Sequence, residues 1–341
     1  MELALELLAL VVLVPIAGAL YQWLGNARDA HRFPAPGRLI DLGGYRLHIH
    51  VMGEGSPPVV FEAGIAATSL SWRLVQPQVA ALTCTASYDR AWLGWSDANP
   101  QPQTIWRIVE ELRSLLDRAG LPRPRILVAH SFGGLVACAY RARYPAEIAG
   151  MVLVDPVAAG EWCEPSESHR KMLRRGILLS RRGGWLARLG VVRIALNLLA
   201  AGGRRFPKAV AQVSSGRGAA VTERIVGEVR KLPPEVWPMI QSHWCNPKCF
   251  EGLARHLEAL PESAGTVAAE VAAGRAGRDV PIIVLSAANA SAEQRAEHEQ
   301  LARWFQGRLE IVPVSGHWMQ LDRPDVVIGA IEEVVSKVRG G

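Results

Sequence analysis

Short apolar runs alternate with longer stretches of helical character along most of the chain. Six of these runs are too short for buried helices and predict strands, at residues 59–61, 83–88, 126–128, 150–154, 281–285 and 309–314. Four intervening or following stretches predict helices, at residues 104–119, 135–144, 291–305 and 325–338. Strands that alternate with helices in this way predict an α/β domain built on a mostly parallel sheet.

A β-hairpin is predicted ahead of this alternation. Residues 39–55 contain two strand-like runs that meet at Gly43 and Gly44, which favour a tight turn. Apolar residues alternate with His48 and His50 in the second run. A strand with one buried face would place both histidines towards solvent.

The N-terminal part of the chain contains an 18-residue apolar stretch, residues 7–24, in which Gln22 is the only strongly polar residue. Its length and its aromatic end at Tyr21 and Trp23 predict a membrane-spanning helix. We therefore expect residues 1–30 to form an uncleaved anchor and linker. The basic residues that follow the stretch place the remaining chain on the cytoplasmic side.

Two other interpretations of this stretch remain open. A cleaved signal peptide could be processed near Ala17 to Ala19, but Glu2 and Glu6 stand where such a peptide carries positive charge. The other interpretation, an amphipathic or core helix, is weakened because this run is apolar on every face.

The strand at residues 126–128 leads directly into Ser131 and then into a helix. Ala129 and Gly133 are small enough to let the strand and helix approach each other. The segment resembles the nucleophile elbow of the α/β-hydrolase superfamily, Gly-x-Ser-x-Gly, with Ala129 in place of the first glycine. The alternative is a helix N-terminus that Ser131 merely caps.

Two further segments resemble motifs of the same superfamily. Residues 88–97 are similar to Tyr-Asp-Arg-x-Gly-x-Gly-x-Ser, with Trp92 in place of the first glycine, which implies structural roles for Asp89 and Arg90. Residues 314–324 resemble the loop that holds the catalytic histidine, and His317 occupies that position.

The resemblance covers about residues 41–338 and implies the α/β-hydrolase fold. This fold is a mostly parallel eight-stranded sheet with helices on both faces and a helical cap inserted after strand 6. The implied core is residues 39–156 and 280–340, and the implied cap or lid is residues 157–279, where the strand–helix alternation stops.

The superfamily places its acid between serine and histidine in sequence, at the carboxyl end of a strand. Only Asp155 and Asp279 are aspartates in that interval, and Asp279 precedes its strand. The loop after residues 281–285 has no acid before Glu293. We therefore predict Asp155 as the acid and keep Glu293 as the alternative.

The resemblance also implies an oxyanion hole formed by the backbone N–H groups of Ile65 and Phe132. The His-Gly pair of many relatives is missing, so Gly64 could replace Ile65. The implied function is that of a serine hydrolase without a cofactor or metal, which cleaves an ester or related acyl bond of a lipophilic small molecule through an acyl-enzyme.

Several related functions stay open at this point. Amidase, peptidase, thioesterase and carbon–carbon hydrolase chemistry uses the same groups. A serine at position 131 argues against dehalogenase and epoxide-hydrolase chemistry, whose nucleophile is an aspartate. A non-catalytic α/β-hydrolase-like protein that binds a ligand or a partner is the alternative from another class.

Charge is unevenly distributed in this chain of net charge +6. Residues 168–222 hold twelve Lys or Arg and no Asp or Glu, interleaved with apolar stretches. Arg193 and Asn197 fall on one narrow polar stripe of an otherwise apolar helix. This region predicts a cap surface that contacts anionic lipid, or else a solvated basic face. No aromatic-basic repeat points to nucleic acid.

The five cysteines are odd in number and irregular in spacing. They argue against a disulfide framework and for a reducing compartment or incidental thiols. Cys245 and Cys249 form a pair without a second pair or a histidine cluster, so no metal site is predicted.

Overall fold

The computed structural model describes residues 2–200, 228–273 and 280–340, without the side chains of residues 2–5 and 7–10. The chain divides into two compact units. Unit 1 comprises Met1–Pro34 and Leu178–Ala254, and unit 2 comprises Ala35–Ile177 and Arg255–Gly341. The sheet and all predicted site residues belong to unit 2.

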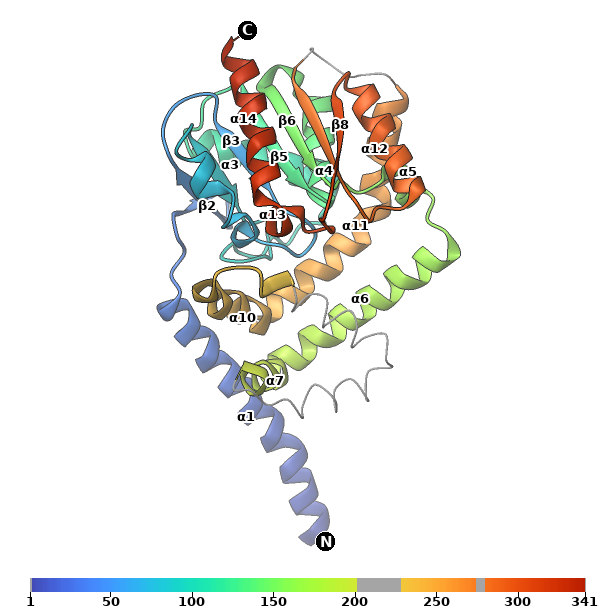
Figure 1. Ribbon diagram of the computed structural model, residues 1–341. Helices are drawn as coiled ribbons and strands as arrows, with labels where there is room; N and C mark the ends of the chain where they lie inside the picture. The colour runs from blue at the N-terminus through green and yellow to red at the C-terminus, as the bar shows by residue number, and fades with distance from the viewer. Residues whose placement is uncertain (1, 201–227, 274–279, 341) are drawn as a thin grey trace. The chain divides into compact units, whose positions relative to one another are not determined.

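Unit 2 is built on one eight-stranded sheet (Figure 1), with the order β1-β2-β4-β3-β5-β6-β7-β8. The strands are β1 Arg38–Asp41, β2 Arg46–Met52, β3 Val59–Glu62, β4 Thr85–Tyr88, β5 Arg125–His130, β6 Ile148–Val154, β7 Ile282–Ala287 and β8 Arg308–Val312. Pairing is antiparallel from β1 to β2 and from β2 to β4, and parallel across the remaining five pairs. The mostly parallel eight-stranded sheet predicted from the sequence is therefore confirmed.

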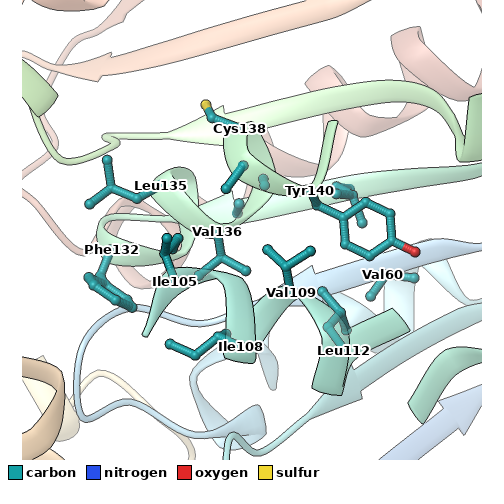
Figure 2. Packing of buried hydrophobic residues seen from close by; sticks show 14 of the residues in the cluster. Val60, Ile105, Ile108, Val109, Leu112, Phe132, Leu135, Val136, Cys138 and Tyr140 are labelled. Atoms are coloured by element: carbon teal, nitrogen blue, oxygen red, sulfur yellow. The ribbon is translucent and has the colours of Figure 1, made fainter. Parts of the chain in front are cut away.

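Helices cover both faces of this sheet. On one face lie α3 Ile105–Arg118, α4 Phe132–Arg143, α12 Ala292–Trp304 and the end of α11 Pro247–Ala272. Figure 2 shows the apolar residues of α3 packed against those of α4 in this layer. On the other face lie α2 Gln76–Val79 and α14 Pro324–Gly340. The remaining short helices of unit 2 are α5 Ala159–Cys163 and α13 Met319–Asp322, with 3-10 turns at Ser69–Trp72 and Pro145–Glu147.

The predicted hairpin forms as β1 and β2, but His48 does not face solvent. Its side chain is fully buried, with Nδ1 3.0 Å from Asp89 Oδ2 and Nε2 2.7 Å from the carbonyl oxygen of Pro36. The prediction of a solvent-facing His48 was therefore wrong. The prediction from strand periodicity assumed that one face of β2 is exposed to solvent. In the structure, the loops at Pro36 and Asp89 cover the His48 side of β2 and supply polar partners.

The described part of the region between β6 and β7 is helical, as expected for an inserted cap. Unit 1 contains α1 Glu2–Arg32, the part of α6 Glu167–Arg188 from Leu178 onward, α7 Val191–Ala200, α10 Trp237–Cys245 and the beginning of α11, with a 3-10 turn at Pro234–Val236. The predicted cap, residues 157–279, is thus shared between the two units. Its residues 201–227 and 274–279 lie outside the described residues.

The predicted membrane anchor coincides with the middle of α1. Within the described part of the chain, no helix taken singly combines the length and apolarity needed to cross a bilayer. Helices α6 and α7, bent by 87° at their junction, meet those criteria as a pair. The single-pass anchor is therefore not supported, and the side chains of residues 7–10 within it lie outside the described set.

Candidate active site

Ser131 occupies the turn between β5 and α4. Its backbone has φ 54° and ψ −120°, a conformation that non-glycine residues rarely adopt. The turn is close to β3, because a Cβ on Gly133 would stand 2.7 Å from the Glu62 carbonyl oxygen. Hydrogen bonds from the backbone N–H groups of Gly134 and Val157 to the Ser131 carbonyl hold the turn in place.

His317 lies in the loop between β8 and α13, and its imidazole joins Ser131 to Asp155. Its Nε2 is 2.9 Å from Ser131 Oγ, and its Nδ1 is 2.7 Å from Asp155 Oδ2. Because a carboxylate only accepts, Nδ1 carries the proton and Nε2 is left to accept the serine hydroxyl hydrogen. This arrangement can remove a proton from Ser131 as its oxygen attacks a carbonyl carbon.

The histidine loop is fixed by its own polar residues. Ser315 Oγ donates to the Val312 carbonyl at 2.9 Å, and the Gly316 N–H donates to Asp322 Oδ2 at 2.8 Å. Asp322 is the aspartate of the Asp-x-Pro spacing that follows His317. In the Ser-Gly-His sequence and the later Asp-x-Pro, the serine and the aspartate therefore both hold the loop in shape.

Asp155 is the first residue after β6, and its carboxylate is satisfied on both oxygens. Oδ1 accepts the Ala287 N–H from the end of β7 at 2.9 Å, while Oδ2 faces His317. Burial raises the pKa of the Asp155 carboxyl, but the hydrogen bonds from His317 and Ala287 outweigh it and hold the pKa below its usual value. Glu293, the alternative acid, is exposed in the first turn of α12.

One predicted oxyanion residue, Phe132, directly follows the nucleophile, and the other, Ile65, lies in a loop close to it. Phe132 is the first residue of α4, so its N–H has no acceptor within the helix. Ile65 belongs to the loop after β3, and a Cβ added to its neighbour Gly64 would lie 3.4 Å from Ser131 Cβ. The start of α4 and the loop after β3 therefore both lie beside Ser131.

Arg90 holds the loop after β3 in place through its guanidinium group. Its guanidinium donates to the Ala63 carbonyl oxygen at 2.8 Å and to that of Gly64, and forms an ion pair with Glu62. Its Nε donates to His256 Nε2 of α11 at 3.1 Å. A planar fork with this many acceptors fixes both the position and the orientation of the loop.

Sequence reasoning missed His130, which precedes Ser131. Its Nε2 donates to the His317 carbonyl oxygen at 2.7 Å, and its ring contacts those of His317 and Trp318 at 4.7 and 5.3 Å between centroids. Burial, with the adjacent His317 ring adding to it, lowers the pKa of His130 to about 3. A neutral donor thus ties the nucleophile strand to the histidine loop.

His298 of α12 was missed as well. Its buried ring has Nε2 2.8 Å from the Pro156 carbonyl oxygen and Nδ1 2.9 Å from Ser286 Oγ. It therefore supports the backbone next to Asp155. The sequence around His298 does not distinguish it from an ordinary core histidine. His130 could have been noticed, because it directly precedes Ser131 in the nucleophile elbow.

A cavity of about 290 Å³ lies between α4, the loop after β6, α11 and α12. Apolar side chains such as Leu135, Val267 and Leu301 form much of its lining. The side chains of Ser131, Asp155 and His317 do not line it. Among the described residues, no group of three metal-binding side chains is assembled.

Known proteins share the part of the chain that contains this site. The model of the alpha/beta hydrolase family matches residues 59–330, a range that includes Ser131, Asp155 and His317. The chain belongs to the alpha/beta hydrolase family. The resemblance and the fold expected from the sequence are thereby confirmed.

Individual relatives are similar to only part of the chain. The uncharacterized protein YbdG of Bacillus subtilis is 28% identical over 152 residues, 44% of this chain and 47% of YbdG. The 2-hydroxy-6-oxo-2,4-heptadienoate hydrolase of Pseudomonas putida is 30% identical over 128 residues, 36% of this chain and 45% of that enzyme. The chain spans about half the length of the curated relatives it matches.

A solved structure matches over more of this alpha/beta hydrolase. An esterase from Thermogutta terrifontis is similar with a TM-score of 0.62 at 21% identity, over 88% of this chain and 97% of the esterase. At this identity the likeness shows the fold alone. The family match and the hydrolase from Pseudomonas putida support hydrolase activity for this chain.

Proposed function

We propose that the protein is a serine hydrolase that cleaves an ester or related acyl bond of a lipophilic small molecule. The observation that carries this proposal is the hydrogen-bonded chain from Ser131 Oγ through His317 to Asp155 Oδ2. Acyl transfer is the chemistry for which a hydroxyl, an imidazole and a carboxylate are combined in this order.

The reaction proceeds in two halves. Ser131 Oγ attacks the acyl carbonyl carbon while His317 Nε2 takes the hydroxyl proton, and the imidazolium then protonates the departing alcohol. Water repeats the sequence on the acyl-serine, and the proton returns to Ser131 Oγ. Asp155 holds the ring in the tautomer with Nδ1–H and stabilises the imidazolium.

The negative oxygen of each tetrahedral intermediate would be bound by the N–H groups of Phe132 and Ile65. The first position is supported by the unpaired start of α4, and the second by the closeness of the loop after β3 to Ser131. The hydrogen bonds that Arg90 donates to the carbonyl oxygens of Ala63 and Gly64 would hold this loop in position.

Lipophilic substrates are favoured by the helices inserted after β6, which we propose to act as the cap. Helices α5 and α11 carry apolar residues towards α4 and α12, where they enclose the mainly apolar cavity. The triad side chains do not line this cavity, so its apolar surface favours a lipophilic substrate only through the part of the molecule remote from the reacting carbonyl.

Fluorophosphonate labelling tests the proposal. The purified protein should be labelled covalently, Ser131→Ala should lose the label, and Ser291→Ala, which changes an exposed serine at the start of α12, should keep it. A series of acyl esters of increasing chain length should then show turnover that depends on Ser131. A folded wild type that takes no label would favour the non-catalytic alternative, a ligand- or partner-binding protein.

A further inference from the structure

Exposed apolar side chains are concentrated on three helices of unit 1. The described part of the chain exposes 23 large hydrophobic side chains, and 17 of them lie on α1, α7 and the part of α6 from Leu178 onward. They are Val11, Val12, Leu13, Val14, Ile16, Leu20, Tyr21, Trp23, Leu24, Leu178, Leu179, Trp185, Leu186, Val191, Ile194, Leu198 and Leu199. We call these residues the apolar surface of unit 1. Contiguous exposed apolar area of this kind marks an interaction site.

A buried polar clasp joins α1 to α7. Arg193 of α7 is 6% exposed and donates to Gln22 Oε1 at 3.1 Å, Asn26 Oδ1 at 2.8 Å and Asp29 Oδ2 at 2.6 Å, all on one face of α1. The polar stripe predicted on α7 therefore faces α1. Because the polar groups are used internally, the outward faces of both helices are left apolar.

The helices also approach closely at small residues. A Cβ on Gly18 of α1 would stand 2.4 Å from the Leu189 carbonyl oxygen, and one on Gly190 would stand 2.9 Å from the Gly18 carbonyl oxygen. Backbones in such contact belong to one packed unit. Helix α1 and the α6–α7 junction therefore lie side by side in unit 1 (Figure 1).

The distribution of apolar residues around α1 favours a fluid partner. Val11, Val12, Leu13 and Val14 are all exposed, and successive residues of a helix point about 100° apart. These four side chains therefore surround most of the helix. A folded copy packs against one side of such a helix, whereas the acyl chains of a lipid layer adapt to whichever sides reach them.

Charge on α7 and on the part of α6 from Leu178 onward matches an anionic layer. Arg181, Arg182 and Arg188 are exposed on α6, and residues 168–200 contain no acidic residue. Trp23 and Trp185 are 66% and 67% exposed, and tryptophan favours the boundary between headgroups and acyl chains. Arginine beside exposed tryptophan and leucine is the combination found in helices that lie in this boundary.

We propose that the apolar surface of unit 1 binds the interfacial layer of an anionic lipid bilayer. The proposal concerns a surface that lies on a membrane, and it rests on side-chain exposure, the Arg193 clasp and charge. It does not depend on the proposed hydrolysis, so either proposal can fail without the other.

Flotation of the purified full chain with lipid vesicles tests this inference. Wild type should float with phosphatidylcholine vesicles that contain phosphatidylglycerol. The triple variant Leu179→Gln, Trp185→Gln and Ile194→Gln should bind roughly a hundredfold less tightly. The matched control Ile311→Gln with Val314→Gln removes two exposed apolar side chains of unit 2 and should bind like wild type. Circular dichroism checks that each variant is folded.

The double variant Arg181→Gln with Arg182→Gln measures the contribution of charge to vesicle binding separately from that of the apolar side chains. Each arginine near the surface contributes about 1 kcal/mol, so binding to anionic vesicles should fall roughly thirtyfold, with little change on neutral vesicles. Wild type that binds neither vesicle overturns the proposal, as does a triple variant that binds like wild type. Sedimentation velocity adds one outcome: a wild-type dimer that the triple variant abolishes would assign the surface to a second copy.

Discussion

The pH dependence of stability should report the buried neutral histidine beside the nucleophile. His130 is 1% exposed, its Nε2 donates to the His317 carbonyl, and its Nδ1 is buried without a hydrogen-bond partner among the described residues. The folded state therefore resists protonation, and the pKa falls from 6.5 to about 3. In the unfolded chain the same ring takes up a proton near pH 6.5.

The direction of the effect follows from proton binding. Between about pH 6.5 and pH 3 the unfolded chain holds a proton on His130 that the folded protein does not, so stability falls as the pH falls through this window. At about pH 4.5 the loss from His130 amounts to about 3 kcal/mol, relative to pH 8. This is a large share of the about 5–15 kcal/mol typical of folded proteins.

Comparison with His130→Gln isolates this contribution. Glutamine can keep an N–H donor towards His317 but does not titrate, so the free energy of unfolding of the variant should fall about 3 kcal/mol less than that of wild type between pH 8 and about pH 4.5. Urea unfolding followed by tryptophan fluorescence measures both curves. Replacing an exposed histidine by His31→Gln controls for the loss of a histidine as such.

A third substitution links stability to function. His130→Phe keeps a ring but has no donor for the His317 carbonyl, so acyl turnover should fall in this variant and be largely kept in His130→Gln. Wild-type and His130→Gln curves that run parallel from pH 8 to about pH 4.5 would refute the buried neutral histidine. Equal turnover of the Phe and Gln variants would refute its role in holding the loop.

Three further tests address the rest of the site. Asp155→Asn should cut turnover by about 10⁴-fold without unfolding the protein, whereas Glu293→Gln should leave turnover near wild type; the reverse pattern would reassign the acid. Gly133→Ala should lower the free energy of unfolding by about 1–3 kcal/mol, because its Cβ would stand under 3 Å from two backbone oxygens, while Gly329→Ala in α14, which has open space, should not destabilise. Arg90→Lys loses the planar fork, so kcat for acyl esters should fall by about tenfold or more while KM changes less; an unchanged kcat would show that the loop after β3 does not need it.

The alternation of apolar runs and helical stretches determined the sheet and its covering helices. Residues 126–128 and 150–154 became β5 and β6, and the stretch at residues 104–119 became α3 with Thr104 as its cap. These features are local, because the period of side-chain burial is set by the backbone geometry of each element. The short motifs around Ser131 and His317 were recognisable for the same reason: each needs a particular turn.

Partners distant in sequence were decided only by the tertiary structure. His48 is buried because Asp89, 41 residues later, meets its ring, and His130 bonds to a carbonyl 187 residues away. Periodicity cannot reveal such pairs, since a polar residue on a strand has the same pattern whether water or a distant carboxylate satisfies it. The same limit applies to Gln22, a single polar residue in the apolar stretch of α1, whose partner Arg193 of α7 is 171 residues away. Long-range packing, rather than local spacing, determined which of these polar groups is buried.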